Sequence, residues 1–371
     1  MNPPSPASQV VYNLPTPTRE LAVTSADGAR IHTEQYGPDD APAVVLAHGW
    51  TCSIGFWAPV IAALAGEFRL IAYDQRGHGR SAPPGYGRYT VETLADDLAA
   101  VLDQTLATGP TGDKERALVV GHSMGGMTIM AAARRTELRE RAAAVLMCST
   151  GAGQLLDETL VVPTPRGWLR RRVHTFVLGS AAPLGRVTPL ARRTMKYVTM
   201  GRGATSEMAD FCARIVHACP RLVRAKWGHM MGDMDLRGNV AALTPPTAVI
   251  GGTADRLTPR VHARRIVSAL PHSLGLTELP GIGHMTPIEV PETVAGAIRG
   301  LVADHLTDHP PRPLTAPRST PRTGTTPRTG AAPHTGAAAE GRTDHLGDRT
   351  SAATPHPPAG PGGSTAKEQT A

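Results

Sequence analysis

Short apolar runs recur along the chain and predict strands that are buried on both faces. Continuous apolar runs of this kind are typical of parallel sheets, whose strands are covered by helices on both sides. Two further strands are expected in residues 21–36, joined by Asp27-Gly28, a dipeptide favoured in hairpin turns. The apolar runs are Val44–His48, Arg69–Asp74, Ala117–Gly121, Ala142–Cys148, Thr247–Gly251 and Leu274–Leu279.

Amphipathic segments separate these runs and predict helices. In residues 90–106 the apolar positions recur at helical spacing, with aspartates between them. Alternation of strands and helices indicates an α/β fold with a mostly parallel, eight-stranded sheet flanked by helices. The predicted helices are Thr90–Leu106, Ser123–Arg135, Pro259–Leu270 and Glu289–Ala303.

Residues 151–243 interrupt this alternation, because they contain no clear buried-strand run. They are rich in Arg and Met and include short helical pieces at Leu190–Tyr197 and Ser206–Ala218. A stretch of this length is too long for a connection between two strands, so we expect a largely helical cap over the sheet.

The composition changes at both ends of the chain. The start is rich in Pro and Ser, and the end repeats a loose Pro-Arg-Thr-Gly or Pro-His-Thr-Gly unit, which is typical of disorder. The expected organisation is a flexible N-terminus (1–17), an α/β core in two parts (18–150 and 244–304), a helical cap (151–243) and a disordered tail (305–371).

The positive charge is concentrated in the predicted cap. The formal net charge of the chain is +7, and residues 151–240 alone hold 14 Lys and Arg against 6 Asp and Glu, a local +8. This surface either keeps the protein in solution or attracts anionic substrates or lipid head groups, so peripheral membrane contact through the basic cap stays open. Nucleic-acid binding is not expected, because no aromatic residues alternate with the basic ones. No run of about 18 apolar residues occurs, so we expect no transmembrane segment.

The cysteine pattern and the N-terminus favour a cytoplasmic protein. The four cysteines form no close pair, and the first 17 residues lack the basic-then-apolar profile of a signal peptide. Zinc-type spacing, a P-loop and a dinucleotide fingerprint are all missing, so we expect neither a metal nor a cofactor.

The segment Gly121–Gly126 (GHSMGG) carries the strongest chemical signal. It fits the nucleophile-elbow pattern G-x-S-x-G, with a predicted strand before it and a helix after it. Glycines on either side of Ser123 allow a turn tight enough to expose the hydroxyl above the sheet edge. We therefore predict Ser123 as a catalytic nucleophile.

A serine nucleophile needs a base, and the base needs an orienting acid. His284 lies in a Gly-rich loop after the last predicted strand, where its imidazole can reach over the sheet edge. Asp255 follows the strand Thr247–Gly251, and the chain order Ser, Asp, His is the one this architecture uses. The alternatives are an ordinary loop histidine and an aspartate that only caps the next helix.

Two backbone N–H groups are predicted to stabilise the oxyanion. One belongs to Met124 at the start of the helix, and the other to Trp50 in the loop His48-Gly49-Trp50. The Trp50 ring is also expected to form a wall of the pocket or to pack in the core.

Together these motifs, with the segment Asp74–Ser81 (DQRGHGRS), resemble the α/β-hydrolase fold family over about residues 21–304 apart from the cap. The resemblance is to the branch that holds small esterases, cofactor-free haloperoxidase-like enzymes and carbon–carbon bond hydrolases. It implies a structural role for Asp74, Arg76 and His78. Ser123 separates the chain from epoxide hydrolases and haloalkane dehalogenases, which have Asp at the elbow.

The predicted reaction is acyl transfer from a small ester or related acyl substrate, through an acyl-enzyme on Ser123. A perhydrolase or haloperoxidase-like activity, carbon–carbon bond hydrolysis, and a receptor without turnover remain alternatives. Carbon–carbon hydrolases often have an aromatic residue after the base, where this chain has Met285. Six methionines of the cap are interpreted as core residues or as adaptable pocket walls: Met195, Met200, Met208, Met230, Met231 and Met234.

Overall fold

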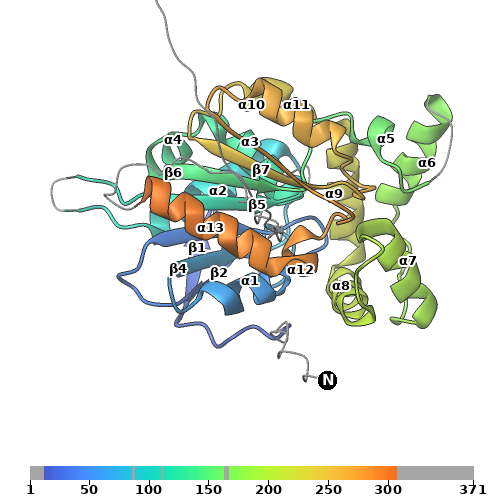
Figure 1. The fold of residues 1–371 in the computed structure, drawn as a ribbon, viewed down its shortest axis with the longest axis horizontal. Coiled ribbons are helices and arrows are strands. Elements are labelled where there is room, and N and C mark those ends of the chain that lie inside the picture. The colour runs from blue at the N-terminus through green and yellow to red at the C-terminus, as the bar shows by residue number, and fades with distance from the viewer. Residues whose placement is uncertain (1–11, 86–87, 110–111, 163–166, 307–371) are drawn as a thin grey trace, which may run out of the picture. The chain divides into compact units, whose positions relative to one another are not determined.

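Eight strands form one sheet in the computed structural model, which describes residues 12–85, 88–109, 112–162 and 167–306 (Figure 1). The spatial order is β1-β2-β4-β3-β5-β6-β7-β8. Residues 1–11 and residues 307–371 of the predicted tail lie outside the described residues, whereas His305, where the tail was predicted to begin, is the last residue of helix α13 (Pro291–His305). The strands are β1 (Arg19–Thr24), β2 (Arg30–Tyr36), β3 (Ala43–Ala47), β4 (Arg69–Tyr73), β5 (Ala117–His122), β6 (Ala142–Cys148), β7 (Thr247–Gly252) and β8 (Ser273–Leu279).

The sheet is mixed but mostly parallel, as the sequence predicts. β1 and β2 form the expected hairpin, in which Gly28 adopts a φ of 82°, and β2 also pairs antiparallel with β4. All other pairs are parallel, and Ala47 of β3 lies opposite both Tyr73 and Gly121. The carboxyl ends of β3, β4 and β5 therefore meet at one edge, where the loops that follow them come together.

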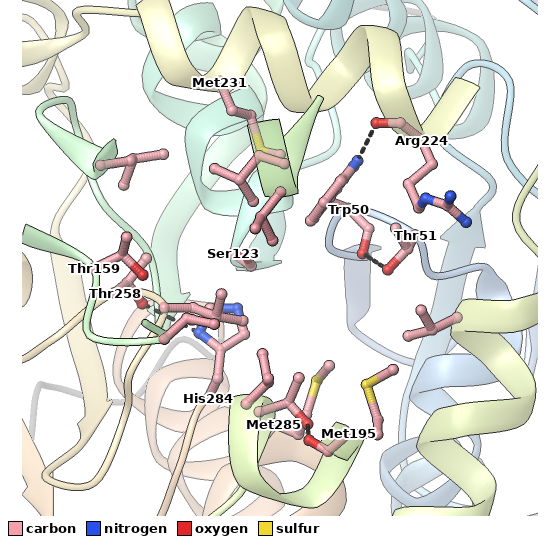
Figure 2. A pocket seen from close by; sticks show the side chains of 18 of the residues that line it. Trp50, Thr51, Ser123, Thr159, Met195, Arg224, Met231, Thr258, His284 and Met285 are labelled. Carbon is pink, nitrogen blue, oxygen red and sulfur yellow. Dashed lines mark hydrogen bonds between the residues drawn. The ribbon is translucent and has the colours of Figure 1, made fainter. Parts of the chain in front are cut away.

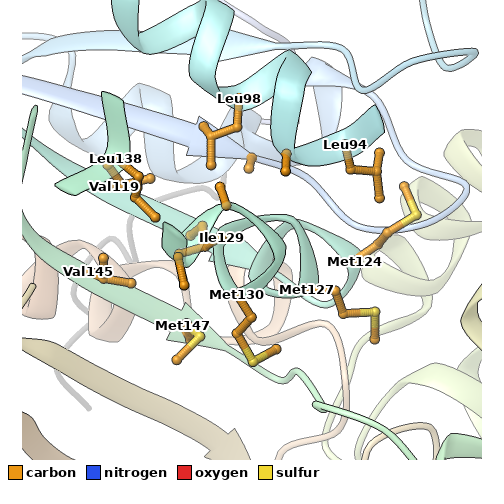
Figure 3. Close-up of a cluster of buried hydrophobic side chains, with 14 of the residues drawn as sticks. Leu94, Leu98, Val119, Met124, Met127, Ile129, Met130, Leu138, Val145 and Met147 are labelled. Atoms are coloured by element: carbon orange, nitrogen blue, oxygen red, sulfur yellow. The ribbon is translucent and has the colours of Figure 1, made fainter. Parts of the chain in front are cut away.

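Helices cover both faces of the sheet. Side chains of alternate strand positions contribute to two separate buried clusters, as the two-residue period of a strand requires. Figure 3 shows part of the first cluster, to which Met127 and Met130 of α3 and Leu94 and Leu98 of α2 all belong. The core helices are α1 (Ala58–Leu64), α2 (Val91–Thr105), α3 (Met124–Ala131), α4 (Thr136–Arg141), α11 (Val261–Ala269), α12 (Thr286–Glu289) and α13 (Pro291–His305), with single 3₁₀ turns η1 (Ile54–Trp57) and η2 (Ala132–Arg134).

The predicted helix Glu289–Ala303 occurs as α13, which begins two residues later, at Pro291. Glu289 ends the short helix α12, and Val290 leaves helical geometry with φ −141° and ψ 59°. Pro291 then starts α13, since its fixed φ and missing N–H suit the first turn of a helix.

The cap lies between β6 and β7 and is helical, as predicted. The two helices expected there occur as α7 and α8, whereas α6 and α9 were not anticipated. In the described ranges, none of the helices is long and apolar enough to cross a membrane. The helices of this region are α5 (Leu155–Glu158), α6 (Trp168–Leu178), α7 (Pro189–Thr199), α8 (Ser206–Ala218), α9 (Arg221–Asp233) and α10 (Arg237–Val240), of which α6–α9 form the cap.

Candidate active site

Ser123 occupies the sharp turn between β5 and α3. Its backbone has φ 52° and ψ −115°, a region that non-glycine residues rarely enter and that costs about 1–3 kcal/mol. The surrounding fold sustains this conformation, because the Ser123 N–H donates to the Cys148 carbonyl oxygen (3.0 Å) and the Thr150 hydroxyl donates to the Ser123 carbonyl oxygen (2.7 Å).

The glycines of the elbow are required by close backbone contacts. A Cβ atom on Gly125 would lie 2.1 Å from the Ala47 carbonyl oxygen, and one on Gly121 would lie 2.6 Å from the Gly125 carbonyl carbon. Neither neighbour is a flexible side chain that could move aside. The turn therefore depends on glycine at both positions.

His284 and Asp255 are joined by a hydrogen bond of 2.8 Å between the imidazole Nδ1 and the carboxylate Oδ2. Both side chains are buried. The other carboxylate oxygen accepts the backbone N–H groups of Leu257 (2.8 Å) and Thr258 (2.9 Å). Asp255 thus orders the turn ahead of α11 and contacts the imidazole at the same time.

Thr258 is a third member of this group that the sequence analysis did not identify. Its hydroxyl donates to Asp255 Oδ2 (2.8 Å) and lies 3.2 Å from His284 Nδ1 (Figure 2). The Asp255 carboxylate therefore accepts from two side chains and two backbone groups, which restricts its rotation.

The backbone of His284 is held by the cap and by the elbow. Its N–H donates to the Thr199 carbonyl oxygen at the end of α7 (2.7 Å), and its own carbonyl oxygen accepts from His122 Nε2 (2.9 Å). Buried Glu289 accepts the N–H groups of Gly201 (2.8 Å) and Gly283 (3.0 Å), and burial raises the pKa of this carboxyl. The loop of His284 is thereby tied to the segment after α7.

Ser123 and His284 border the same cavity (Figure 2). Within the described part of the chain, no hydrogen bond joins the Ser123 hydroxyl to His284. The Nε2 atom of His284 has no hydrogen-bond partner there, because both side-chain bonds of this imidazole are made by Nδ1. Catalytic hydrogen bonds are often long or poorly aligned in the absence of substrate. The structure thus brings Asp255 and His284 into direct contact and places Ser123 on the shared cavity wall.

Two backbone N–H groups near Ser123 have no acceptor among the described residues: those of Trp50 and Met124. The loop that carries Trp50 passes close to the elbow, since a Cβ on Gly49 would lie 3.1 Å from the Ser123 Cβ. Both groups therefore remain available to an oxygen atom of a ligand.

The loop of Trp50 is supported by two buried neutral histidines. His48 Nε2 accepts the N–H of Gln75 (2.9 Å), and His78 Nε2 accepts the N–H of Thr51 (3.2 Å). Burial lowers the pKa of His48 to about 4 and that of His78 to about 3. Both imidazoles are neutral near pH 7, as an acceptor nitrogen requires.

Asp74 and Arg76 complete this support. The Asp74 carboxylate accepts the backbone N–H groups of Ile54 and Arg80, both at 2.8 Å. The Arg76 guanidinium is buried and forms ion pairs with Asp27 and Asp97. These contacts hold the rim below the cavity, and neither residue lines it.

The cavity has a volume of about 280 Å³ and a mostly apolar lining that comes from the core and the cap. The Trp50 ring forms one wall, and its indole N–H donates to the Arg224 carbonyl oxygen on α9 (2.9 Å; Figure 2). Of the six cap methionines, Met195 and Met231 border the cavity. In the ranges that the structure describes, no cluster of His, Cys, Asp or Glu is arranged to hold a metal ion.

Comparison with protein families decides the affiliation. The model of the alpha/beta hydrolase family matches residues 44–297, a range that includes the elbow, Asp255 and His284. The chain belongs to the α/β hydrolase family. This affiliation agrees with the strand order of the sheet and with the strand–turn–helix context of Ser123.

Relatives of this α/β hydrolase include several named activities. The chain is 25% identical to 3-oxoadipate enol-lactonase 1 of Acinetobacter baylyi, over 76% of this chain and 96% of that protein. It is 36% identical to a non-heme chloroperoxidase of Streptomyces lividans, over 37% of this chain and 47% of that one. Among solved structures, a thermophilic esterase of Thermogutta terrifontis has a TM-score of 0.61 and 25% identity, covering 78% of this chain and all (100%) of the esterase.

Proposed function

We propose that this α/β hydrolase cleaves carboxylic esters or related acyl substrates, with Ser123 as nucleophile, His284 as general base and Asp255 as the acid that orients it. The observation that supports this best is the Asp255–His284 hydrogen bond on the wall of the cavity that Ser123 also borders. The esterase and lactonase among the relatives support the same reaction class.

In the proposed reaction, the Ser123 oxygen attacks the substrate carbonyl carbon while His284 Nε2 takes the hydroxyl proton. The N–H groups of Trp50 and Met124 donate to the oxyanion, each contributing about 3 kcal/mol in such a site. His284 then protonates the leaving alcohol, and water hydrolyses the acyl-enzyme by the same steps in reverse. Asp255 keeps the Nδ1 proton in place and stabilises the imidazolium.

The lining favours a neutral, apolar acyl group. Arg224 is the one permanently charged residue among the described lining residues, and its guanidinium donates to the carbonyl oxygens of Ser180 (3.2 Å) and Ala182. The Arg224 guanidinium therefore already has hydrogen-bond acceptors within the protein. The volume of about 280 Å³ lies just below the usual range for ligand pockets, about 300–1,000 Å³, which suits short to medium acyl chains.

Hydrolysis of nitrophenyl esters from acetate through decanoate tests the proposal. The Ser123→Ala and His284→Ala variants should lose turnover of every ester, whereas Ser268→Ala, a matched change on the exposed side of α11, should keep it. Full activity in Ser123→Ala would refute the assignment of the nucleophile.

A perhydrolase activity is the second candidate, and the chloroperoxidase among the relatives supports it. The same residues would form an acyl-enzyme from a carboxylic acid, and hydrogen peroxide would replace water. Halide oxidation in acetate and peroxide, compared with ester hydrolysis under the same conditions, distinguishes the two activities.

A further inference from the structure

Large apolar side chains are exposed in one region of the described chain. All nine that the structure exposes lie between Leu160 and Leu222, in and beside the cap. Exposed apolar residues of a monomeric protein are normally scattered singly, and a contiguous group marks an interaction site. Figure 1 shows α6 and α7 on the outer side of the cap, away from the sheet.

Helix α6 has an exposed face that is apolar and basic together. Trp168 (70% exposed), Arg172 and Phe176 (77% exposed) follow one another at intervals of four residues and so share one face of the helix. The opposite face, with Arg170 and His174, is buried. The large aromatic side chains of α6 therefore point away from the core of the cap.

Helix α7 repeats this arrangement. Leu190 (73% exposed), Arg193 and Tyr197 are spaced three and four residues apart and lie on one face. The segment that joins the two helices adds exposed Leu184 and Arg186. We call the exposed side of α6, of residues 179–188 and of α7 the cap face.

The arginines of the cap face are free to bind an external anion. Arg172, Arg186 and Arg193 have no acidic partner among the described residues. Other cap arginines are neutralised within the protein, as Arg171 is by Asp157 and Arg192 by Asp210. The cap face thus combines apolar side chains with unpaired positive charge.

The cavity opens towards the same surface. Val177 and Leu184 are exposed and also line the cavity, and both α6 and α7 contribute further lining residues. A molecule that covers the cap face would therefore lie at the entrance to the cavity.

We propose that the cap face docks on lipid bilayers that contain anionic phospholipid. Trp, Phe and Leu beside Arg on the same helix are the composition of helices that lie in a membrane interface. The apolar side chains would enter the boundary between head groups and acyl chains, and the arginines would contact lipid phosphates. Docking is separate from the proposed chemistry, but it would let apolar esters enter the cavity from the bilayer.

Cosedimentation of the full chain with vesicles tests the proposal. We expect binding to phosphatidylcholine vesicles with added phosphatidylglycerol, weakening as salt rises, and much weaker binding to pure phosphatidylcholine. The double change Arg172→Gln with Arg193→Gln should lower the partition coefficient about 25-fold. Arg139 is an exposed arginine on α4, outside the cap, so Arg139→Gln is the matched control and should leave vesicle binding unchanged.

A second variant, Trp168→Ser with Phe176→Ser, should abolish vesicle binding while keeping turnover of a water-soluble ester. Ser123→Ala should bind vesicles as the parent protein does, which separates docking from the proposed chemistry. Equal binding by all variants would overturn the proposal. The proposal would also fail if the parent protein did not bind anionic vesicles. In that case, self-association in sedimentation velocity that is lost in Trp168→Ser with Phe176→Ser would assign the cap face to contact between copies of the chain.

Discussion

Thr258 provides the sharpest test of how the imidazole is positioned. Its hydroxyl donates to Asp255 Oδ2 (2.8 Å) and lies 3.2 Å from His284 Nδ1. Thr258→Val keeps the shape of the side chain and removes this donor. A hydrogen bond to a charged group contributes about 1.5–3 kcal/mol, so if the loss is felt in the transition state, kcat/KM falls about 10- to 150-fold.

The assay is steady-state hydrolysis of a nitrophenyl ester, with urea unfolding to measure stability in parallel. Thr258→Ser retains the hydroxyl and should restore most of the activity. Thr159→Val is the matched control, since Thr159 also lines the cavity but donates to the Arg256 carbonyl oxygen (2.8 Å), away from the imidazole. Equal losses of kcat/KM in Thr258→Val and Thr159→Val would refute the positioning role.

Three further variants test the elbow and its supports. Gly125→Ala should unfold the elbow or lower activity at least 100-fold, because its Cβ would lie 2.1 Å from the Ala47 carbonyl oxygen, whereas Gly66→Ala, with open space around it, should be neutral in both unfolding and ester assays. His78→Gln should make the unfolding free energy less dependent on pH. The pKa of His78 is about 3 in the folded protein and 6.5 in the unfolded chain, so His78 lowers the unfolding free energy by about 1.4 kcal/mol per pH unit as pH falls from 6.5 towards 3. If the unfolding free energy of His78→Gln, measured in urea, changed with pH between 6.5 and 4 as steeply as that of the parent protein, this reasoning would be contradicted. Trp50→Phe removes the indole hydrogen bond to the Arg224 carbonyl oxygen but leaves the backbone N–H of residue 50, so the unfolding free energy should fall by about 1–2 kcal/mol. KM should rise more than kcat falls, and a larger fall in kcat would argue against a role of the Trp50 ring as a pocket wall.

The strands of the core were predictable because each one is buried on both faces. β3, β4, β5 and β6 are continuous apolar runs, and their order along the chain with intervening helices indicates a parallel sheet. The elbow was predictable for a local reason as well. Its glycines are required by close contacts with backbone atoms within a few residues of Ser123 and in the adjacent strand.

Helix α6 was missed because its polarity does not follow its burial. In α6 the polar Arg170 and His174 are buried, while the apolar Trp168 and Phe176 are exposed. A method that assigns apolar residues to the interior therefore finds no clear inner face. The contacts that place this helix come from distant residues, such as the close approach of Gly228 on α9 to the Leu178 carbonyl oxygen.

The groups around His284 were missed for a related reason. Thr199, His122 and Glu289 each contact its loop through the fold, and no local pattern links them to the imidazole. Thr258 lies three residues after Asp255, and this spacing is the one signal that would have drawn attention to it. Asp255 does not cap α11, because the N-cap of that helix is Arg260 and no side chain caps it; one carboxylate oxygen of Asp255 orders the turn before the helix, and the other binds the imidazole.

Covalent labelling with a fluorophosphonate, followed by peptide mass spectrometry, tests the central claim most directly. A hydroxyl activated by the His284–Asp255 pair should yield a single adduct on the peptide that contains Ser123, and His284→Ala should suppress it. An unlabelled parent protein, or an adduct on another serine with Ser123 unmodified, would contradict the account of this cavity as a serine hydrolase site.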